Sequence, residues 1–240
     1  MFDFLKKPVI EFYCHPDHSG TIPEPYPAAY SMPEWFKRLP QTFNETDQFG
    51  APSMTAKKCL PMLDAMSLGY IIPLQGDLYV TTNDDRSILD VRNPPLLKAA
   101  EFHSLAQVGG KKGPGAPAPP VKFINHWVVK TRPGWSTLFL PLVNTDNKDF
   151  TCLGGLVDTD KYPKEVNFPA IWNTPNFDGV LKAGTPLVVA IPIKRSDVPK
   201  YPVIRPMSKS EFAKIKQIDK IQGIRRSHYT QELRVDRNGK

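Results

Sequence analysis

Between residues 68 and 193, apolar side chains come in short alternating runs separated by glycine, proline, asparagine and aspartate. Alternation of this kind is typical of strands with one buried face, and the turn residues end each strand. The pattern predicts a mainly β fold, built as an antiparallel sandwich or barrel. The expected strands are 68–74, 77–82, 87–91, 121–131, 135–142, 150–158, 166–172, 179–181 and 185–193.

Two short turns lie between expected strands. Gln75-Gly76 separates 68–74 from 77–82, and Arg132-Pro133-Gly134 separates 121–131 from 135–142. A Gly-containing turn between two apolar runs favours a hairpin, so we expect the second pair of strands to hydrogen-bond to each other. Residues 109–120 are almost all Gly, Pro, Ala and Lys, which predicts a low-complexity loop, either flexible or held by a partner.

The first 67 residues have a different pattern and predict an irregular, proline-rich N-terminal arm. One strand is expected at 8–14, and the alternating prolines of 22–28 exclude a helix and favour extended chain. Short helices are expected at 31–39, with Ser31 as a cap and Trp35 and Phe36 packed on the core, and at 58–66.

The chain ends in one well-marked helix. Ser208 and Glu211 have the spacing of a capping box, and Gly223 is expected to end the helix. Apolar residues follow at every third position: Phe212, Ile215, Ile218 and Ile221. We therefore expect three parts, namely the arm at 1–67, the β core at 68–205 and a helix with a basic tail at 206–240, with the apolar stripe docked on the β core.

Composition adds two facts to this picture. The 240 residues include 26 prolines, which lower the entropy of the unfolded chain. The net charge of +7 is uneven: residues 194–240 hold 13 Lys and Arg against 5 Asp and Glu. This segment is expected to meet nucleic acid or an acidic protein face. Its candidate partner-binding residues are Lys209, Lys214, Lys216, Lys220, Arg225 and Arg226.

The sequence also bears on the compartment. No apolar run approaches the roughly 20 residues of a membrane span, and residues 1–8 do not have the pattern of a secretory leader. Three widely spaced cysteines do not make a disulfide framework. We expect a protein of a reducing compartment such as a host cytoplasm, or of a virion, with no membrane partner.

Four segments of the β core resemble successive motifs of the dUTPase and dCTP deaminase superfamily. They are Gly76-Asp77-Leu78-Tyr79, Pro133-Gly134-Trp135-Ser136, Gly155-Leu156-Val157-Asp158-Thr159-Asp160-Lys161-Tyr162 and Lys182-Ala183-Gly184-Thr185-Pro186-Leu187-Val188-Val189-Ala190-Ile191. The resemblance covers about residues 68–193. It implies a water-orienting role for Asp158, deoxyribose packing for Tyr162, ligand binding by Asp77, Ser136 and Asp160, and Mg²⁺ as the cofactor.

The chain departs from that superfamily at its phosphate-binding positions. Ser136 is followed by the apolar run 137–140 instead of a helix turn, and Pro163-Lys164 replaces the usual Arg-Gly. The tail has one glycine where a closing segment is glycine-rich. These departures favour a protein without nucleotide hydrolysis.

The whole chain resembles a family of uncharacterised proteins of tailed phages and some bacteria. The shared segments are 22–28, 33–37, the Trp127 to Ser136 region and 167–172. The resemblance implies a phage setting and no known activity.

A metal site is the third possibility. His15 and Asp17 have the His-X-Asp spacing of two ligands of an iron facial triad, for which His103, His126 or His228 would be the third. The leading hypothesis is a non-enzymatic phage protein, structural or assembly-related and without a cofactor, that binds copies of itself or other virion proteins. A nucleotide-binding or nucleotide-hydrolysing protein is the alternative, and a metal-dependent oxygenase is the third.

Overall fold

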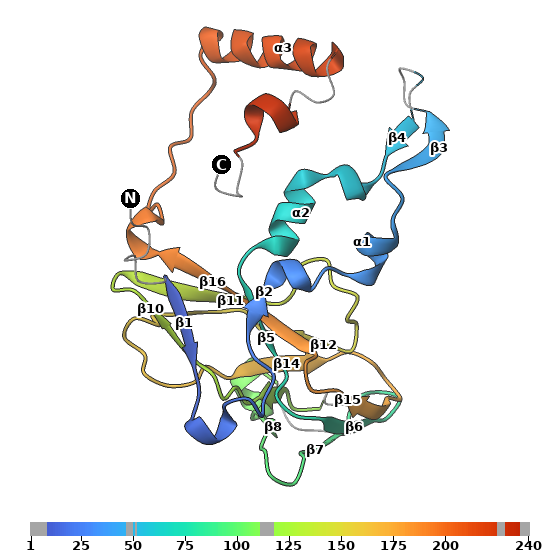
Figure 1. Cartoon of the computed structure of the whole chain (residues 1–240), viewed down its shortest axis with the longest axis vertical. Helices are drawn as coiled ribbons and strands as arrows, with labels where there is room; N and C mark the ends of the chain where they lie inside the picture. Colours follow the sequence, from blue (N-terminus) through green and yellow to red (C-terminus); the bar gives the residue numbers. More distant parts are fainter. Residues whose placement is uncertain (1–8, 47–49, 51, 111–117, 225–228, 236–240) are drawn as a thin grey trace. The chain divides into compact units, whose positions relative to one another are not determined.

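The structure is a computed structural model of the chain, and it describes residues 9–46, 50, 52–110, 118–224 and 229–235. It consists of two units, residues 1–198 and 199–240, called here the body and the C-terminal unit. The body is mainly β, as expected (Figure 1).

All paired strands of the described body run antiparallel. The five-stranded sheet has the order β13 (Gly155–Val157), β11 (Trp135–Leu140), β16 (Pro186–Lys194), β5 (Tyr70–Pro73) and β2 (Tyr26–Pro27). The four-stranded sheet has the order β12 (Phe150–Cys152), β14 (Phe168–Trp172), β9 (Val121–Phe123) and β8 (Ala100–Phe102), and the three-stranded sheet has the order β15 (Asp178–Leu181), β6 (Leu78–Thr82) and β7 (Leu89–Arg92). The two-stranded sheets are β1 (Ile10–Tyr13) with β10 (Val128–Thr131), and β3 (Thr42–Thr46) with β4 (Pro52–Met54). These described strands close no barrel, so the fold is sandwich-like.

Short helices and turns connect the strands. The α-helices are α1 (Glu34–Arg38), α2 (Leu60–Ser67) and α3 (Lys209–Ile224). The 3₁₀ turns are η2 (Pro16–His18), η3 (Ala28–Tyr30), η4 (Ala56–Lys58), η5 (Leu105–Val108) and η6 (Arg195–Asp197), and η7 (Tyr229–Leu233) is a π-helical turn.

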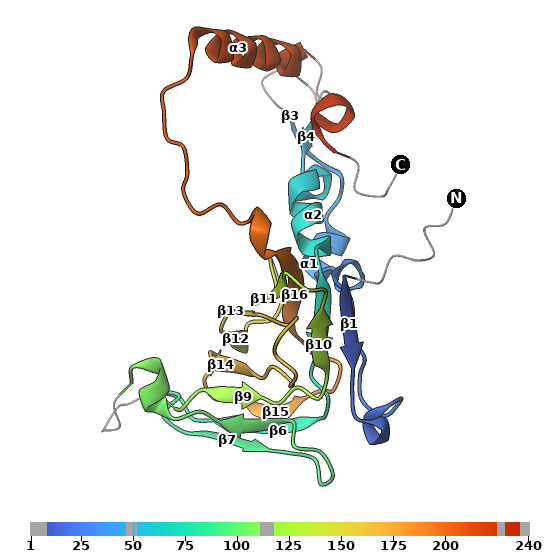
Figure 2. The ribbon, with the colours of Figure 1, turned by 90° about the vertical axis from the view of Figure 1, so that its left-hand side faces the viewer.

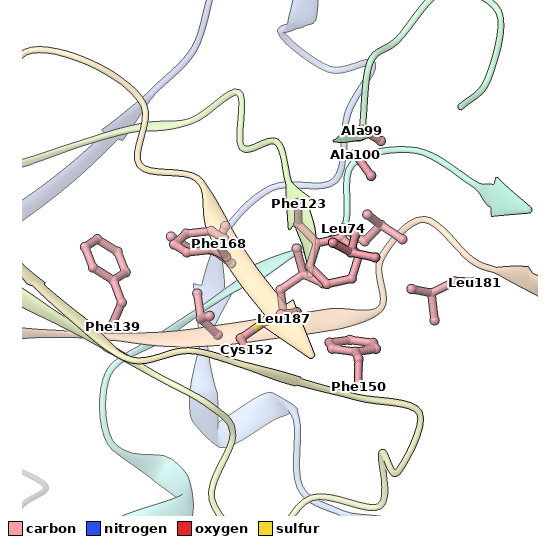
Figure 3. Packing of buried hydrophobic residues seen from close by; sticks show 14 of the residues in the cluster. Leu74, Ala99, Ala100, Phe123, Phe139, Phe150, Cys152, Phe168, Leu181 and Leu187 are labelled. Atoms are coloured by element: carbon pink, nitrogen blue, oxygen red, sulfur yellow. The ribbon is translucent and has the colours of Figure 1, made fainter. Parts of the chain in front are cut away.

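The core lies between the five-stranded and four-stranded sheets, and residues of the three-stranded sheet and of the β1–β10 pair complete it. The ring centroids of Phe139, on β11, and Phe168, on β14, are 5.5 Å apart across the interface between the sheets. Figure 3 shows Leu187 and Cys152 directed into the same space, with Phe123 and Phe150 beside them. The alternation predicted from the sequence is therefore what builds this core.

The strand pairing differs from expectation at the Arg132–Gly134 turn. The expected hairpin of 121–131 with 135–142 is wrong: β10 pairs with β1, while β11 pairs with β13 and β16. The long expected strand is also interrupted, because the buried Asn125 side chain bonds the backbone N–H and C=O of Trp127. The turn therefore passes the chain from one sheet to another instead of closing a hairpin.

The N-terminal segment packs against the body at several points. Besides the pairing of β1 with β10, the Trp127 Nε1–H donates to the Pro23 carbonyl at 3.0 Å. Ala28 donates its N–H to the carbonyl of Gly69, also at 3.0 Å. Helix α1 lies in the expected range, but its N-cap is Pro33 and not Ser31. The first helical N–H, that of Glu34, donates instead to Asp146, so a distant residue supplies the cap.

Helix α3 has the predicted capping box. The Glu211 N–H donates to Ser208 Oγ, and the Ser208 N–H donates to Glu211 Oε2 at 2.8 Å. Arg205 holds the same carboxylate through both of its Nη atoms. The described part of the helix continues through Gly223 to Ile224, so Gly223 does not end it as expected. The capping pattern thus located the helix start.

Candidate functional site

Three of the predicted site residues meet around one arginine that the sequence analysis did not select. Ser136 lies at the start of β11, Asp158 and Asp160 lie in the turn after β13, and Arg195 follows β16 directly. Because β11 pairs with both β13 and β16, the ends of these three strands come together at one edge (Figure 2). We call Ser136, Asp158, Asp160 and Arg195 the arginine cluster.

Asp160 is the most tightly held member of the cluster. Arg195 Nη1 and Nη2 donate to its two carboxylate oxygens at 2.9 and 2.6 Å, and the Gly134 N–H donates at 2.8 Å. Its side chain is only 2% exposed. The Arg195 guanidinium lowers the pKa of the Asp160 carboxyl to about 2, and the Gly134 N–H adds to this effect. Asp160 is therefore a fixed anion whose oxygens are taken by its own chain.

Asp158 is more open but is also engaged. Its Oδ1 accepts from Ser136 Oγ at 2.6 Å and from Arg195 Nη1 at 3.3 Å, while its side chain is 61% exposed. Ser136 is buried and also accepts from Arg195 at 3.0 Å. The carboxylate beside the serine hydroxyl, that of Asp158, is also engaged by Arg195, and the same arginine binds Asp160. The arrangement thus ties three strand ends together.

The other residues carried by the resemblance lie apart from these contacts. Tyr162 is exposed, and its described bond is a backbone one, from its N–H to the Asp158 carbonyl. Asp77 accepts from Lys182 Nζ at 2.9 Å and from the Ala183 N–H at 2.8 Å, so it fixes the turn before β16. The Ala183 N–H, and after it the Lys182 ammonium, lower the pKa of Asp77. The structure thus brings together Ser136, Asp158 and Asp160, but not Asp77.

The signal for Arg195 was weak in the sequence. It is one of two successive basic residues at the end of the strand that carries the fourth motif. A basic residue in that place is common by chance, and only the pairing of β16 with β11 brings it to the two aspartates.

The histidines form contacts of a different kind. Asp17 lies beside His15, with 3.4 Å between His15 Nδ1 and Asp17 Oδ2, and the rings of His18 and His126 pack edge to face. His126 Nε2 lies 3.0 Å from the Lys98 carbonyl, and His103 bonds Gln107. Burial lowers the pKa of His126. No three or more His, Cys, Asp or Glu side chains come together as a metal site within the described ranges, and His228 lies outside them.

A cleft of about 350 Å³ lies beside β14 and η5. Its lining is mostly apolar and includes Leu89, Leu105 and Trp172. Gly110 and Ala118 also line it, and residues 111–117 between them are outside the described part, so one boundary of this cleft is undefined.

The C-terminal unit has a different surface. In the extended segment before α3, Tyr201, Val203 and Ile204 are 87%, 86% and 90% exposed. Met207, Phe212 and Ile215 are exposed as well. Four predicted partner-binding residues, Lys209, Lys214, Lys216 and Lys220, are exposed on α3, and Arg225 and Arg226 lie outside the described residues. Phe212 and Ile215 of the predicted apolar stripe are thus exposed, whereas Ile218 and Ile221 are partly buried, and the docking of the stripe on the β core stays a prediction.

Comparisons do not narrow the choice among these surfaces. No protein-family model matches the chain, and no curated protein proved similar to it. None of the described helices is both long and apolar enough to cross a membrane. The functional argument therefore rests on the residues and their geometry.

Proposed function

We propose that the chain is a non-enzymatic structural or assembly protein of a phage, and that its C-terminal unit binds other copies of the chain. The phage setting follows from the whole-chain resemblance described above. The observation that carries the proposal is the exposure of Tyr201, Val203 and Ile204 in one extended segment. Contiguous exposed apolar side chains of this kind mark protein interaction sites in soluble proteins.

The linker composition favours binding to a partner copy. Pro199, Pro202 and Pro206 fall within eight residues, and such proline-rich segments behave as semi-rigid extended spacers. A semi-rigid spacer has fewer conformations than a flexible one. It therefore loses little entropy when a partner binds, which favours association.

The body offers a matching apolar surface. On the outer face of the five-stranded sheet, Leu138 lies opposite Leu156 on one side and Ile191 on the other, so the three side chains are cross-strand neighbours. Leu156 is exposed, and the other two are half-buried. Every copy therefore carries both an apolar segment and an apolar sheet face, as a head-to-tail assembly requires.

Sedimentation equilibrium of the full chain tests this proposal. Val203→Ser together with Ile204→Ser removes about 2–4 kcal/mol of burial, so self-association should weaken about 30- to 1,000-fold. Leu156→Ser, on the receiving face, should weaken it as well. Ile88→Ser with Leu96→Ser, two exposed residues of the body, is the matched control and should leave association unchanged. A wild-type chain that stays monomeric, or a control that dissociates equally, contradicts the proposal.

A thermal-shift assay separates this proposal from the nucleotide alternative, which predicts that a nucleotide raises the melting temperature. Because Arg195 engages both aspartates, we expect no change in melting temperature with any deoxynucleoside triphosphate and Mg²⁺. A ligand at about 100 times its Kd would add roughly 2.7 kcal/mol, or several degrees for a chain of this size. A shift with one nucleotide that Asp158→Ala abolishes would favour the alternative and contradict a purely structural role.

A further inference from the structure

Three lysines of α3 lie in one line along the helix. At about 100° per residue, Lys216 and Lys220 fall within about 20° of Lys209 around the helix axis. At about 1.5 Å per residue, the line from Lys209 to Lys220 is about 16 Å long. Ile215 and Ile218 project from the opposite side of the same helix. We call Lys209, Lys216 and Lys220 the lysine stripe.

The positive charge of the lysine stripe is accessible to a partner. All three side chains are exposed, and no ion pair joins any of them to a carboxylate within the described part of the chain. Glu211, one of the two acidic residues of α3, is held by Arg205. The other, Asp219, is exposed and offsets one charge. Lys216 Nζ lies 4.8 Å from the centroid of the Phe212 ring, a contact that leaves its charge in place.

The net charge of the chain is also concentrated in the C-terminal unit. Residues 199–240 hold 11 of the 31 Lys and Arg and 4 of the 24 Asp and Glu, a net of +7. The remaining 20 and 20 leave residues 1–198 neutral. The whole net charge of the chain therefore belongs to the unit that carries the lysine stripe, and the body neither attracts nor repels a polyanion strongly.

We propose that the lysine stripe binds the phosphate backbone of duplex DNA without reading its sequence. A straight row of point charges fits a regular row of phosphates, and lysine binds phosphate as a point charge. Phe212 is the single aromatic side chain of α3, and Lys216 Nζ lies over its ring. Single-strand binding uses several aromatic side chains that stack on successive bases. The lysine stripe also has no Arg, Asn or Gln positioned within it for base-edge contacts.

The position of the stripe argues against an anionic membrane as the partner. A helix that inserts into a lipid surface does so through its apolar face. On α3 that face contains Ile215 and Ile218, so insertion would direct the lysine stripe away from the headgroups. DNA binding, in contrast, uses neither this apolar face nor the segment of Tyr201, Val203 and Ile204, so it does not depend on the self-association proposed above.

Fluorescence anisotropy with a labelled mixed-sequence duplex of about two helical turns tests the proposal on the full chain. The variant Lys209→Gln, Lys216→Gln, Lys220→Gln should bind more weakly, and its slope of log K against log salt should be shallower by about 2.7 between about 50 and 200 mM salt. The control Lys130→Gln, Lys148→Gln, Lys164→Gln loses the same net charge from exposed body lysines and should keep the wild-type slope. Glutamine has nearly the helix propensity of lysine, so circular dichroism should be unchanged.

Three results would overturn the proposal. The first is no duplex binding by the wild-type chain at about 50 mM salt, where phosphate contacts are strongest. The second is an equal loss in both triple variants, which would mean a general charge effect. The third is a preference for polyglutamate or for phosphatidylserine vesicles over the duplex, which would assign the stripe to an acidic protein or to a lipid surface. Because the self-association variants leave the stripe intact, failure of one proposal is separable from failure of the other.

Discussion

Arg195→Ala is expected to destabilise the body and to lower its melting temperature by several degrees, more than the loss of an exposed ion pair would. The substitution leaves the almost fully buried Asp160 carboxylate with the Gly134 N–H as its remaining partner described above. An uncompensated buried charge is costly, whereas an exposed ion pair contributes little. Differential scanning calorimetry at neutral pH measures the effect.

Two comparisons make this result specific. Arg92→Ala breaks an exposed pair with Asp90 and should cost less than about 1 kcal/mol. Adding Asp160→Asn to Arg195→Ala should restore part of the stability, because the amide removes the buried charge. If Arg195→Ala proves as mild as Arg92→Ala, the arginine cluster does not stabilise the body.

The effect of Arg195→Ala should also depend on pH. The folded-state pKa of Asp160 is about 2, below its ordinary value of 3.8. A carboxyl with a lowered folded pKa contributes stability that is present above 3.8 and is lost as pH falls to about 2. The stability difference between the wild type and Arg195→Ala should therefore be constant from neutral pH to about pH 5 and shrink below it.

Gly69→Ala is expected to destabilise the body by about 2–5 kcal/mol in chemical denaturation. Gly69 has φ +82°, and a Cβ there would lie 2.5 Å from the backbone oxygen of Ala190, on the neighbouring strand β16. The left-handed backbone costs an alanine about 1–2 kcal/mol, and relieving the contact moves a buried strand.

Gly184→Ala separates these two causes. Gly184 has φ +88° but nothing within 4 Å of its would-be Cβ, so this variant should lose only the backbone contribution. A Gly69→Ala variant no less stable than Gly184→Ala would mean that β16 gives way at little cost.

Much of the fold could be predicted because strand formation is signalled locally. The alternation in 77–82 corresponds to β6, the continuous apolar run in 185–193 corresponds to β16, and the Ser208–Glu211 spacing located the start of α3. Each of these patterns depends on neighbouring residues and on turn residues within a few positions.

Strand pairing could not be predicted in the same way. The turn at Arg132–Gly134 has the local chemistry of a hairpin, yet β10 pairs with β1 and β11 pairs with β16. The decision depends on Asn125, a buried polar side chain that ends β9 by bonding the nearby backbone, and on a β1 strand that lies more than 100 residues earlier. Nothing near the turn in sequence signals either contact.

The candidate site, too, could be predicted only in part from the sequence. The resemblance implied site roles for Asp77, Ser136, Asp158, Asp160 and Tyr162. The structure brings Ser136, Asp158 and Asp160 together and leaves Asp77 apart. The resemblance did not show that Arg195 holds both carboxylates, because that arginine reaches them only through the register of β16 on β11.

The sequence by itself determined the β character of the body, the start of α3, and the concentration of positive charge after residue 198, since each depends on local pattern or on counting. The tertiary structure alone decided which strands pair, that Asp160 is a buried anion held by Arg195, and that the apolar side chains of 201–215 are left exposed. The physical reason is that burial and pairing depend on residues distant in the chain, whose approach no local pattern encodes.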